Sequence, residues 1–159
     1  MVEPDLKRVI RTFTEAGAKF VLIGGFAVIA HEVLRTTDDC DLLIPDGDSK
    51  NDAAVISALE SMGCDAADGL GLTLERLTGR EHLRVESPSV GIVDIMRGGL
   101  PPLDFDSVLK ASIPGTLDGV EFRIAGLASL VAFKRLAGRA QDIADLEKLE
   151  EIHGPLPEA

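Results

Sequence analysis

Apolar residues follow two different spacings along the chain of 159 residues. Helical spacing gathers apolar side chains on one face of a segment, and it predicts helices at residues 5–16, 52–62, 105–111, 127–137 and 141–152. Short apolar runs are typical of buried strands, and they predict strands at residues 19–23, 39–44, 90–96 and 120–124. Between the first two strands, residues 24–32 are expected to begin with a glycine turn and to continue as a mostly apolar, buried helix.

Residues 70–86 show two short alternations of apolar and polar positions. They predict two further strands that join near Thr78 and Gly79. The elements then follow the order helix, strand, helix, strand, helix, several strands and finally helices. This order predicts a single α+β domain, residues 1–159, with helices packed on a mixed sheet. We expect its core at residues 5–124 and a C-terminal helix pair at residues 125–153.

Two glycines and two aspartates flank the helix between the first two predicted strands. Asp39 and Asp41 are spaced i, i+2, so their side chains point to the same face of a strand and repel each other. A hard divalent cation such as Mg²⁺ relieves that repulsion, because it prefers carboxylate oxygen ligands. Gly24 and Gly25 allow a phosphate to approach the backbone closely. The stretch therefore predicts a metal–nucleotide site; the alternative is a pair of acidic residues that cap a loop beside an edge strand.

The same stretch follows a known pattern: Gly-Gly, a short helix, and then Arg-x-Thr-x-Asp-x-Asp before an aliphatic strand. The residues that match it position by position are Gly24, Gly25, Arg35, Thr37, Asp39 and Asp41. In these positions the chain resembles the nucleotidyltransferases of the DNA polymerase beta superfamily, and most of all their small bacterial members. These include toxin-antitoxin and abortive-infection nucleotidyltransferases. The resemblance implies a nucleotidyltransferase-like fold with a mixed sheet.

Two positions depart from the family pattern. Phe26 stands where the family often has a serine that touches a phosphate, and His31-Glu32 stands where it often has His-Gly. Phe26 favours an alternative in which the chain binds a nucleotide or a partner protein without catalysis. His31 lies near the end of the predicted helix and is expected to pack or cap rather than act as a general base. Thr37 could contact a phosphate or cap the connection before the strand. Arg35 could bind a phosphate or brace the acidic loop. The pattern does not choose between these roles.

Asp94 lies inside an apolar strand, Gly91-Ile-Val-Asp-Ile-Met96. A buried carboxylate is costly there unless it is paired or binds a cation. The family resemblance implies that a third carboxylate completes the metal site and helps to deprotonate the attacking hydroxyl, and Asp94 is the candidate. The alternative is a salt bridge from Asp94 to Arg84 or Arg97.

Lys134 continues an apolar stripe on the predicted helix at residues 127–137, so its side chain projects from the core-facing side. A lysine there needs an anion, and a triphosphate would serve. The alternative is a side chain whose stem packs while its charged head reaches water. Lys134 followed by Arg139, Asp142 and Asp145 also matches a pattern common in the small family members. We interpret these last residues as a salt-bridged helix junction.

The charge balance limits the partners. Acidic residues outnumber basic ones by 27 to 16, which gives a formal net charge of −11, so the chain has no general attraction for a phosphate backbone. An RNA acceptor would need a local basic patch, for which the candidates are Arg76, Arg80, Arg84 and Arg97; solvated surface is the alternative. The two cysteines lack metal-ligand spacing, and neither a signal peptide nor an apolar run of about 20 residues is found. We therefore expect reduced thiols in a cytoplasmic protein without a membrane partner.

Together with the resemblance, these residues predict a metal-dependent nucleotidyltransferase. The resemblance implies that Asp39, Asp41 and Asp94 hold two Mg²⁺ ions, or Mn²⁺ instead, and that a nucleoside triphosphate is the substrate. A nucleoside monophosphate would pass to an acceptor hydroxyl, and pyrophosphate would leave. The expected acceptor is RNA, such as a tRNA end, or a partner protein, with a cognate toxin or antitoxin as a further partner. The alternatives are a small-molecule acceptor, as in antibiotic adenylyltransferases, and the non-catalytic binder.

Overall fold

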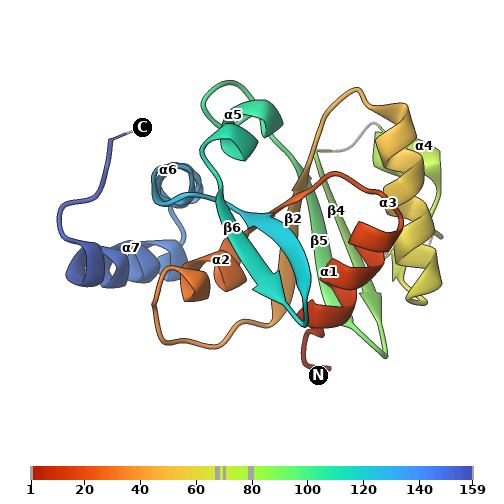
Figure 1. Ribbon diagram of the computed structural model, residues 1–159, viewed down its shortest axis with the longest axis horizontal. Coiled ribbons are helices and arrows are strands. Elements are labelled where there is room, and N and C mark those ends of the chain that lie inside the picture. Colours follow the sequence, from red (N-terminus) through yellow and green to blue (C-terminus); the bar gives the residue numbers. More distant parts are fainter. Residues whose placement is uncertain (1, 67–68, 70, 79–80, 159) are drawn as a thin grey trace.

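The computed structural model describes residues 2–66, 69, 71–78 and 81–158. Its strands are β1 (Val21–Ile23), β2 (Asp39–Ile44), β3 (Asp65–Ala66), β4 (His82–Ser87), β5 (Gly91–Arg97), β6 (Ile113–Leu117) and β7 (Val120–Ile124). Its helices are α1 (Leu6–Glu15), α2 (Gly24–Ala30), α3 (Ser49–Ser61), α4 (Leu74–Thr78), α5 (Phe105–Lys110), α6 (Leu127–Ala137) and α7 (Ala140–His153). Figure 1 shows α6 and α7 at one end of the molecule and α3 and α4 at the other, with the strands between them. Of the helices in the described ranges, none combines the length and the apolar character needed to cross a membrane.

The described strands form a seven-stranded sheet in the order β3-β4-β5-β2-β1-β7-β6. The central strand β2 runs parallel to β5 and antiparallel to β1, while β1 runs parallel to β7. On the other side of β5, β4 pairs with it in the antiparallel direction. The predicted α+β fold with a mixed sheet is confirmed. The strand order, which the sequence pattern does not supply, places β2 beside β5.

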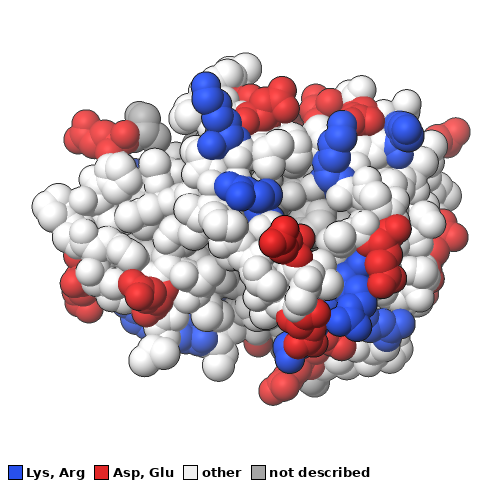
Figure 2. All heavy atoms as spheres, viewed as in Figure 1, with Lys and Arg blue, Asp and Glu red and all other residues white. Residues whose placement is uncertain are grey.

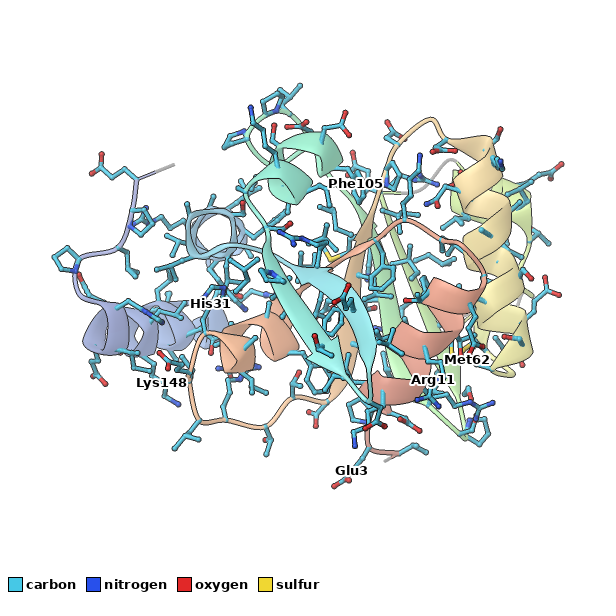
Figure 3. All side chains as sticks on the ribbon, viewed as in Figure 1. Glu3, Arg11, His31, Met62, Phe105 and Lys148 are labelled. Atoms are coloured by element: carbon cyan, nitrogen blue, oxygen red, sulfur yellow. The ribbon has the colours of Figure 1, made fainter. Side chains whose placement is uncertain are left out.

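Side-chain alternation along β2 divides the core between the two faces of the sheet. The even-numbered residues of β2 belong to the larger hydrophobic cluster, which also contains residues of α1 and α3. Leu43 belongs to a smaller cluster on the opposite face, together with Phe105 of α5 (Figure 3). Asp39 and Asp41 share the face of Leu43, so they lie outside the larger core and remain partly exposed.

Several elements agree closely with their sequence predictions. The bounds of β2 and α6 match residue for residue, and Gly138 ends α6 in the left-handed conformation. α1 begins after Asp5, whose carboxylate accepts a hydrogen bond from the backbone N–H of Arg8. α3 begins earlier than predicted, because Asp48 caps it in the same way by accepting from the N–H of Asn51.

Residues 70–86 differ from the predicted pair of strands. The described part of the first one contains the helix α4, Leu74–Thr78. The backbone N–H of Arg76 donates to the hydroxyl of Thr73, which supports a helical turn, and the leucine spacing places Leu77 in the core. The predicted junction at residues 78–79 lies partly outside the described residues. The second predicted strand is confirmed as β4.

The sequence pattern does not predict β3 or β6. β3 is too short to show an alternation. β6 contains Pro114 and Gly115, which usually argue against a strand. It lies at the edge of the sheet, where a missing backbone N–H is tolerated, and Gly115 leaves room for the side chains of Phe122 and Ile124.

Candidate metal and nucleotide site

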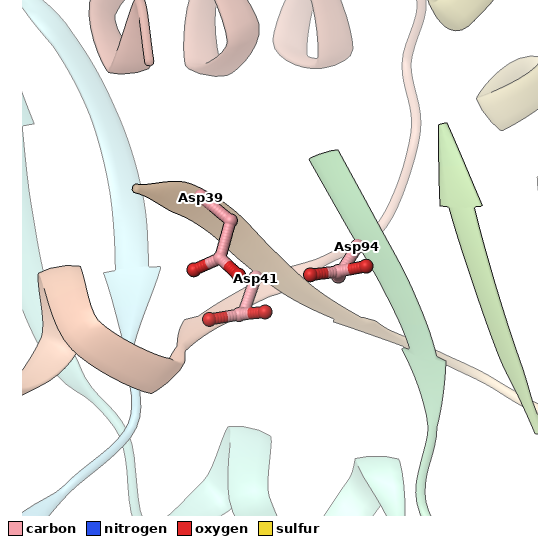
Figure 4. Close-up of side chains that lie close together, drawn as sticks. All are labelled: Asp39, Asp41 and Asp94. Atoms are coloured by element: carbon pink, nitrogen blue, oxygen red, sulfur yellow. The ribbon is translucent and has the colours of Figure 1, made fainter. Parts of the chain in front are cut away.

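Strand register brings three carboxylates together near the centre of the sheet. Asp41 of β2 stands opposite Asp94 of the parallel strand β5, and Asp39 lies two residues earlier on the same face of β2. Each of these side chains offers one oxygen, and the oxygens lie within 4.8 Å of one another (Figure 4). The structure thus gathers the predicted metal ligands Asp39, Asp41 and Asp94, which we call the carboxylate cluster.

The electrostatics of the carboxylate cluster suit a hard divalent cation. Burial, followed by the charges of Asp39 and Asp94, raises the pKa of Asp41 to about 7. Burial and the charge of Asp94 also raise the pKa of Asp39 above its ordinary value. A cation among these oxygens would relieve both the desolvation and the repulsion. Because carboxylate oxygens are the ligands that Mg²⁺ prefers, the residues present fit the predicted metal.

Arg84 of β4 contacts the same cluster. Its Nε donates to Oδ1 of Asp94 at 2.9 Å, and its Nη2 donates to Oδ2 of Asp94 at 2.9 Å and to Oδ2 of Asp39 at 3.2 Å. Nε2 of His82 lies 2.8 Å from Oδ1 of Asp94. Burial acts to raise the pKa of Asp94, but the hydrogen bonds from Arg84 and His82 outweigh it and lower the pKa below its ordinary value. The alternative expected for Asp94, a salt bridge to Arg84, is therefore present within the cluster.

Gly24 and Gly25, the first residues of α2, pack against residues of this site. Gly24 has a φ of +70°, and a Cβ there would overlap the side chain of Asp41. A Cβ on Gly25 would overlap the side chain of Thr37, whose hydroxyl lies 3.5 Å from Oδ1 of Asp39. Glycine at both positions therefore lets the first turn of α2 pack directly against Asp41 and Thr37. The predicted contacts of Gly24, Gly25 and Thr37 with a phosphate stay predictions.

Lys134 of α6 is buried and forms ion pairs with two buried carboxylates of α7. Its Nζ is 3.1 Å from Oδ1 of Asp142 and 2.9 Å from Oδ2 of Asp145, and Nε of Arg139 is 2.7 Å from Oδ2 of Asp142. The interpretation of Arg139, Asp142 and Asp145 as a salt-bridged helix junction is confirmed, and Lys134 belongs to it. The positive charge of Lys134 also acts on the cluster, since it opposes the rise in the pKa of Asp41. Its predicted contact with a triphosphate stays a prediction.

Arg35 and His31 have structural partners. Nη1 of Arg35 lies 3.2 Å from Oδ2 of the fully buried Asp145, which favours the role of a brace between the loop before β2 and α7. Nε2 of His31 lies 2.8 Å from the carbonyl oxygen of Ala125, and the carbonyl oxygen of His31 lies 2.7 Å from Nε2 of His153. His31 sits between α2 and α7 (Figure 3). It therefore packs and hydrogen-bonds as expected, away from the carboxylate cluster.

Among the described arginines that were proposed as an RNA-binding patch, Arg84 and Arg97 pair with carboxylates. Arg97 has a side chain only 5% exposed, with Nη2 2.9 Å from Oδ2 of Asp52 and Nη1 2.7 Å from the carbonyl oxygen of Pro45. The prediction is wrong for Arg97, which is part of the folded interior. Arg84 contacts the carboxylate cluster, Arg76 donates to the carbonyl of Gly71, and Arg80 lies outside the described residues. Figure 2 shows acidic and basic side chains interspersed over the visible face.

Sequence reasoning misses the contact of His82 with the cluster, and it offers the Arg84 contact only as an alternative to metal binding. A signal exists, because the alternation of β4 places His82 and Arg84 on one face. The antiparallel register then sets Arg84 directly opposite Asp94. Without knowledge that β4 pairs with β5, the alternation alone does not identify these partners.

No protein-family model matches the chain, and no curated protein matches it in sequence. Solved structures match it in fold. The lincosamide antibiotic adenylyltransferase LnuA, in its lincomycin-bound crystal structure, has a TM-score of 0.68 and 15% identity over 95% of this chain and 99% of its own. The chain has a nucleotidyltransferase fold.

Two further structures share this fold with the chain. ANT(2'')-Ia in complex with adenylyl-2''-tobramycin has a TM-score of 0.60 and 15% identity, over 91% of this chain and 84% of its own. An antigenic nucleotidyltransferase-like protein from Paracoccidioides brasiliensis has a TM-score of 0.53 and 16% identity, over 94% of this chain and 77% of its own. At these identities the similarity concerns the fold, so the site must be argued from the residues of this chain.

Proposed function

We propose that this protein is a metal-dependent nucleotidyltransferase, which moves a nucleoside monophosphate from a nucleoside triphosphate to an acceptor hydroxyl. The observation that supports this most strongly is the carboxylate cluster, whose three oxygens lie within 4.8 Å of one another on adjacent strands of a nucleotidyltransferase fold. Burial and repulsion raise the pKa of Asp41 to about 7, so the cluster is costly without a cation. Such a cost is typical of a site that binds a ligand.

Each group of residues has its own role in this reaction. Asp39, Asp41 and Asp94 would hold the divalent ions, with Mg²⁺ as the expected metal, and such ions would supply positive charge that stabilises the attacking and leaving oxygens. Gly24 and Gly25 let the triphosphate approach the backbone, and Thr37 contacts a phosphate beside Asp39. The acceptor oxygen forms a bond to the α-phosphorus while the bond to the β-phosphate oxygen breaks. The acceptor hydroxyl gives its proton to a carboxylate oxygen of Asp94, and pyrophosphate leaves.

Beside the loop that precedes β2 there is room for a ligand, in a space that none of the three carboxylates lines. Phe26, Arg35 and Thr37 help to line a hollow of about 480 Å³, which lies in the size range of small-molecule sites. Phe26 replaces the serine of the family pattern and has no hydroxyl. Thr37 and the backbone of Gly24 and Gly25 therefore make the phosphate contact in this proposal. Lys134 supports the triphosphate with its positive charge, from a position that Asp142 and Asp145 fix.

We infer that the acceptor is a small molecule with a hydroxyl group. The net charge of −11 opposes RNA binding, and Arg84 and Arg97, which an RNA patch would need, contact carboxylates instead. The ligands of two proteins of the same fold, lincomycin in LnuA and adenylyl-2''-tobramycin in ANT(2'')-Ia, support a small-molecule acceptor. RNA ends and partner proteins of a toxin-antitoxin system are the competing acceptors.

Radiolabelled nucleoside triphosphates test this function. The protein is incubated with Mg²⁺ and a triphosphate labelled at the α- or the γ-phosphate, together with a panel of hydroxylated antibiotics, total RNA or lysate protein. We expect the α-label in the small-molecule fraction, no γ-label there, and no transfer by Asp41→Asn. α-Label on RNA or protein would contradict the proposed small-molecule acceptor but would still support nucleotidyl transfer. Transfer of the γ-label, or no transfer to any fraction, would contradict the function itself.

A further inference from the structure

The guanidinium of Arg84 occupies the carboxylate oxygens that a metal ion would need. It keeps its proton throughout the ordinary pH range and so stays positively charged. Its hydrogen bonds reach both oxygens of Asp94 and one oxygen of Asp39. An oxygen that binds a divalent ion directly cannot keep a cation at hydrogen-bond distance without repulsion between the two positive charges. Arg84 and a metal ion therefore compete for the same oxygens.

Arg84 can leave these oxygens without disturbing the sheet. Its backbone is fixed by the pairing of β4 with β5, where Arg84 stands opposite Asp94. Its side chain, in contrast, is 46% exposed, while that of Asp94 is only 4% exposed. A rotation of the long arginine side chain into solvent would uncover Asp39 and Asp94 while both carboxylates stay in place. The carboxylates are held by the central strands, and the exposed partner is the one that moves.

We propose that Arg84 is a built-in counter-cation of the carboxylate cluster, and that a divalent ion enters the site by exchange with it. In the metal-free protein, the guanidinium neutralises part of the charge on Asp39 and Asp94 and keeps the carboxylates assembled. When a divalent ion binds, the guanidinium withdraws from these oxygens. This exchange takes the carboxylate cluster as a metal site, and so it rests on the proposed function. The exchange adds to that function an intramolecular competitor, the guanidinium of Arg84, which lowers the affinity of the site for metal.

Mn²⁺ binding measures this competition directly. Free Mn²⁺ is counted by electron paramagnetic resonance in titrations of the wild type, Arg84→Gln and Arg11→Gln without nucleotide. Arg11 is an exposed arginine on α1 (Figure 3), so its replacement reports the effect of charge at a distance from the site. We expect Arg84→Gln to bind Mn²⁺ about tenfold more tightly than the wild type, because a competing charge-assisted hydrogen-bond partner is removed. Arg11→Gln should bind like the wild type.

A second readout uses the wild type and does not depend on the folding of a variant. The side-chain Nε–H of Arg84, which donates to Asp94 at 2.9 Å, is followed by nuclear magnetic resonance during a titration with diamagnetic Mg²⁺. We expect its chemical shift and its protection from exchange with water to change in step with metal binding. The Nε–H of Arg97, whose guanidinium pairs with Asp52 in the interior, should not respond.

The outcomes separate this inference from the proposed function. Equal or weaker Mn²⁺ binding by Arg84→Gln, or an Nε–H signal of Arg84 that does not change while Mg²⁺ binds, would overturn the exchange and leave the metal site standing. If neither the wild type nor Arg84→Gln binds Mn²⁺ or Mg²⁺, the metal site fails, and the exchange fails with it.

Discussion

Gly24 lies against the side chain of Asp41, in a backbone conformation that residues with a side chain rarely adopt. The two residues come from different elements, α2 and β2, and the contact joins the glycine turn to the carboxylate cluster. A Cβ at residue 24 would overlap Oδ2, Cγ and Cβ of Asp41. The turn therefore depends on glycine both for its φ of +70° and for the space that Asp41 fills.

A pair of glycine substitutions separates these two requirements. Gly17 has a φ of +73°, and no atom lies within 4 Å of the point where a Cβ would stand, so Gly17→Ala should cost only the backbone strain of about 1–2 kcal/mol. Gly24→Ala should cost about 1–3 kcal/mol more, because the added methyl group displaces Asp41. It should also weaken Mn²⁺ binding, which Gly17→Ala leaves intact. Urea unfolding and Mn²⁺ titration measure the two effects, and equal losses of stability would contradict the contact.

The raised pKa of Asp41 predicts a pH-dependent stability. Its folded pKa of about 7 lies above the ordinary value of 3.8, so between these values the folded state holds a proton that the unfolded state has released. The contribution of Asp41 is therefore most favourable below pH 4 and is lost as the pH rises through about 7. In EDTA, Asp41→Asn should match the wild type near pH 4 and exceed it by about 1–3 kcal/mol at pH 8. Unfolding free energies at several pH values measure this, and parallel curves for the two proteins would contradict it.

Lys134 allows its structural and binding roles to be separated. Replacement by methionine leaves the buried carboxylates of Asp142 and Asp145 without its charge, and we expect a loss of about 3 kcal/mol in unfolding free energy. Lys148→Met on the exposed side of α7 (Figure 3) is the matched control and should change stability by less than about 0.5 kcal/mol. If Lys134 also supports the triphosphate, Lys134→Met should weaken triphosphate binding by about 1.5–3 kcal/mol and leave nucleoside binding unchanged. If Lys134→Met weakens triphosphate binding and nucleoside binding equally, the role of Lys134 is structural alone.

Arg97 should behave as a core residue. Arg97→Gln leaves Asp52 buried without its guanidinium partner, so we expect a loss of about 3 kcal/mol in unfolding free energy. Arg11→Gln, on the surface of α1, should have little effect. Urea unfolding of both variants checks this. An Arg97→Gln protein as stable as Arg11→Gln, with weaker RNA binding, would return Arg97 to the proposed basic patch.

The local features of the fold could be predicted from the sequence because they do not depend on distant partners. The short apolar run of β2 and the helical spacing of α6 predict the bounds of those elements. The spacing of Asp39 and Asp41 places them on one face of a strand whichever strands pair beside it. Asp94 could be proposed because a carboxylate in an apolar strand is costly, and because the family resemblance implies a third carboxylate.

The features that the sequence could not supply depend on non-local pairing. Arg84 meets Asp94 only because β4 pairs with β5 in one particular register. Arg97 looks like a surface residue in the sequence, yet the fold buries it against Asp52. The local sequence does not predict β6, because Pro114 and Gly115 usually argue against a strand. The edge position of β6 in the sheet tolerates both residues. In each case the contact is made with another element, and the local sequence does not show where that element lies in the fold.

Nucleotide binding with and without metal tests the central claim most directly. Calorimetric titrations of the wild type and Asp41→Asn are run at pH 8 with each nucleoside triphosphate, in Mg²⁺ or in EDTA. We predict that the wild type binds at least one triphosphate about tenfold or more tightly in Mg²⁺ than in EDTA. Asp41→Asn should be folded and should lose this metal-dependent gain. Metal-dependent binding by Asp41→Asn that equals the wild type would contradict the assignment of the carboxylate cluster as the metal and nucleotide site.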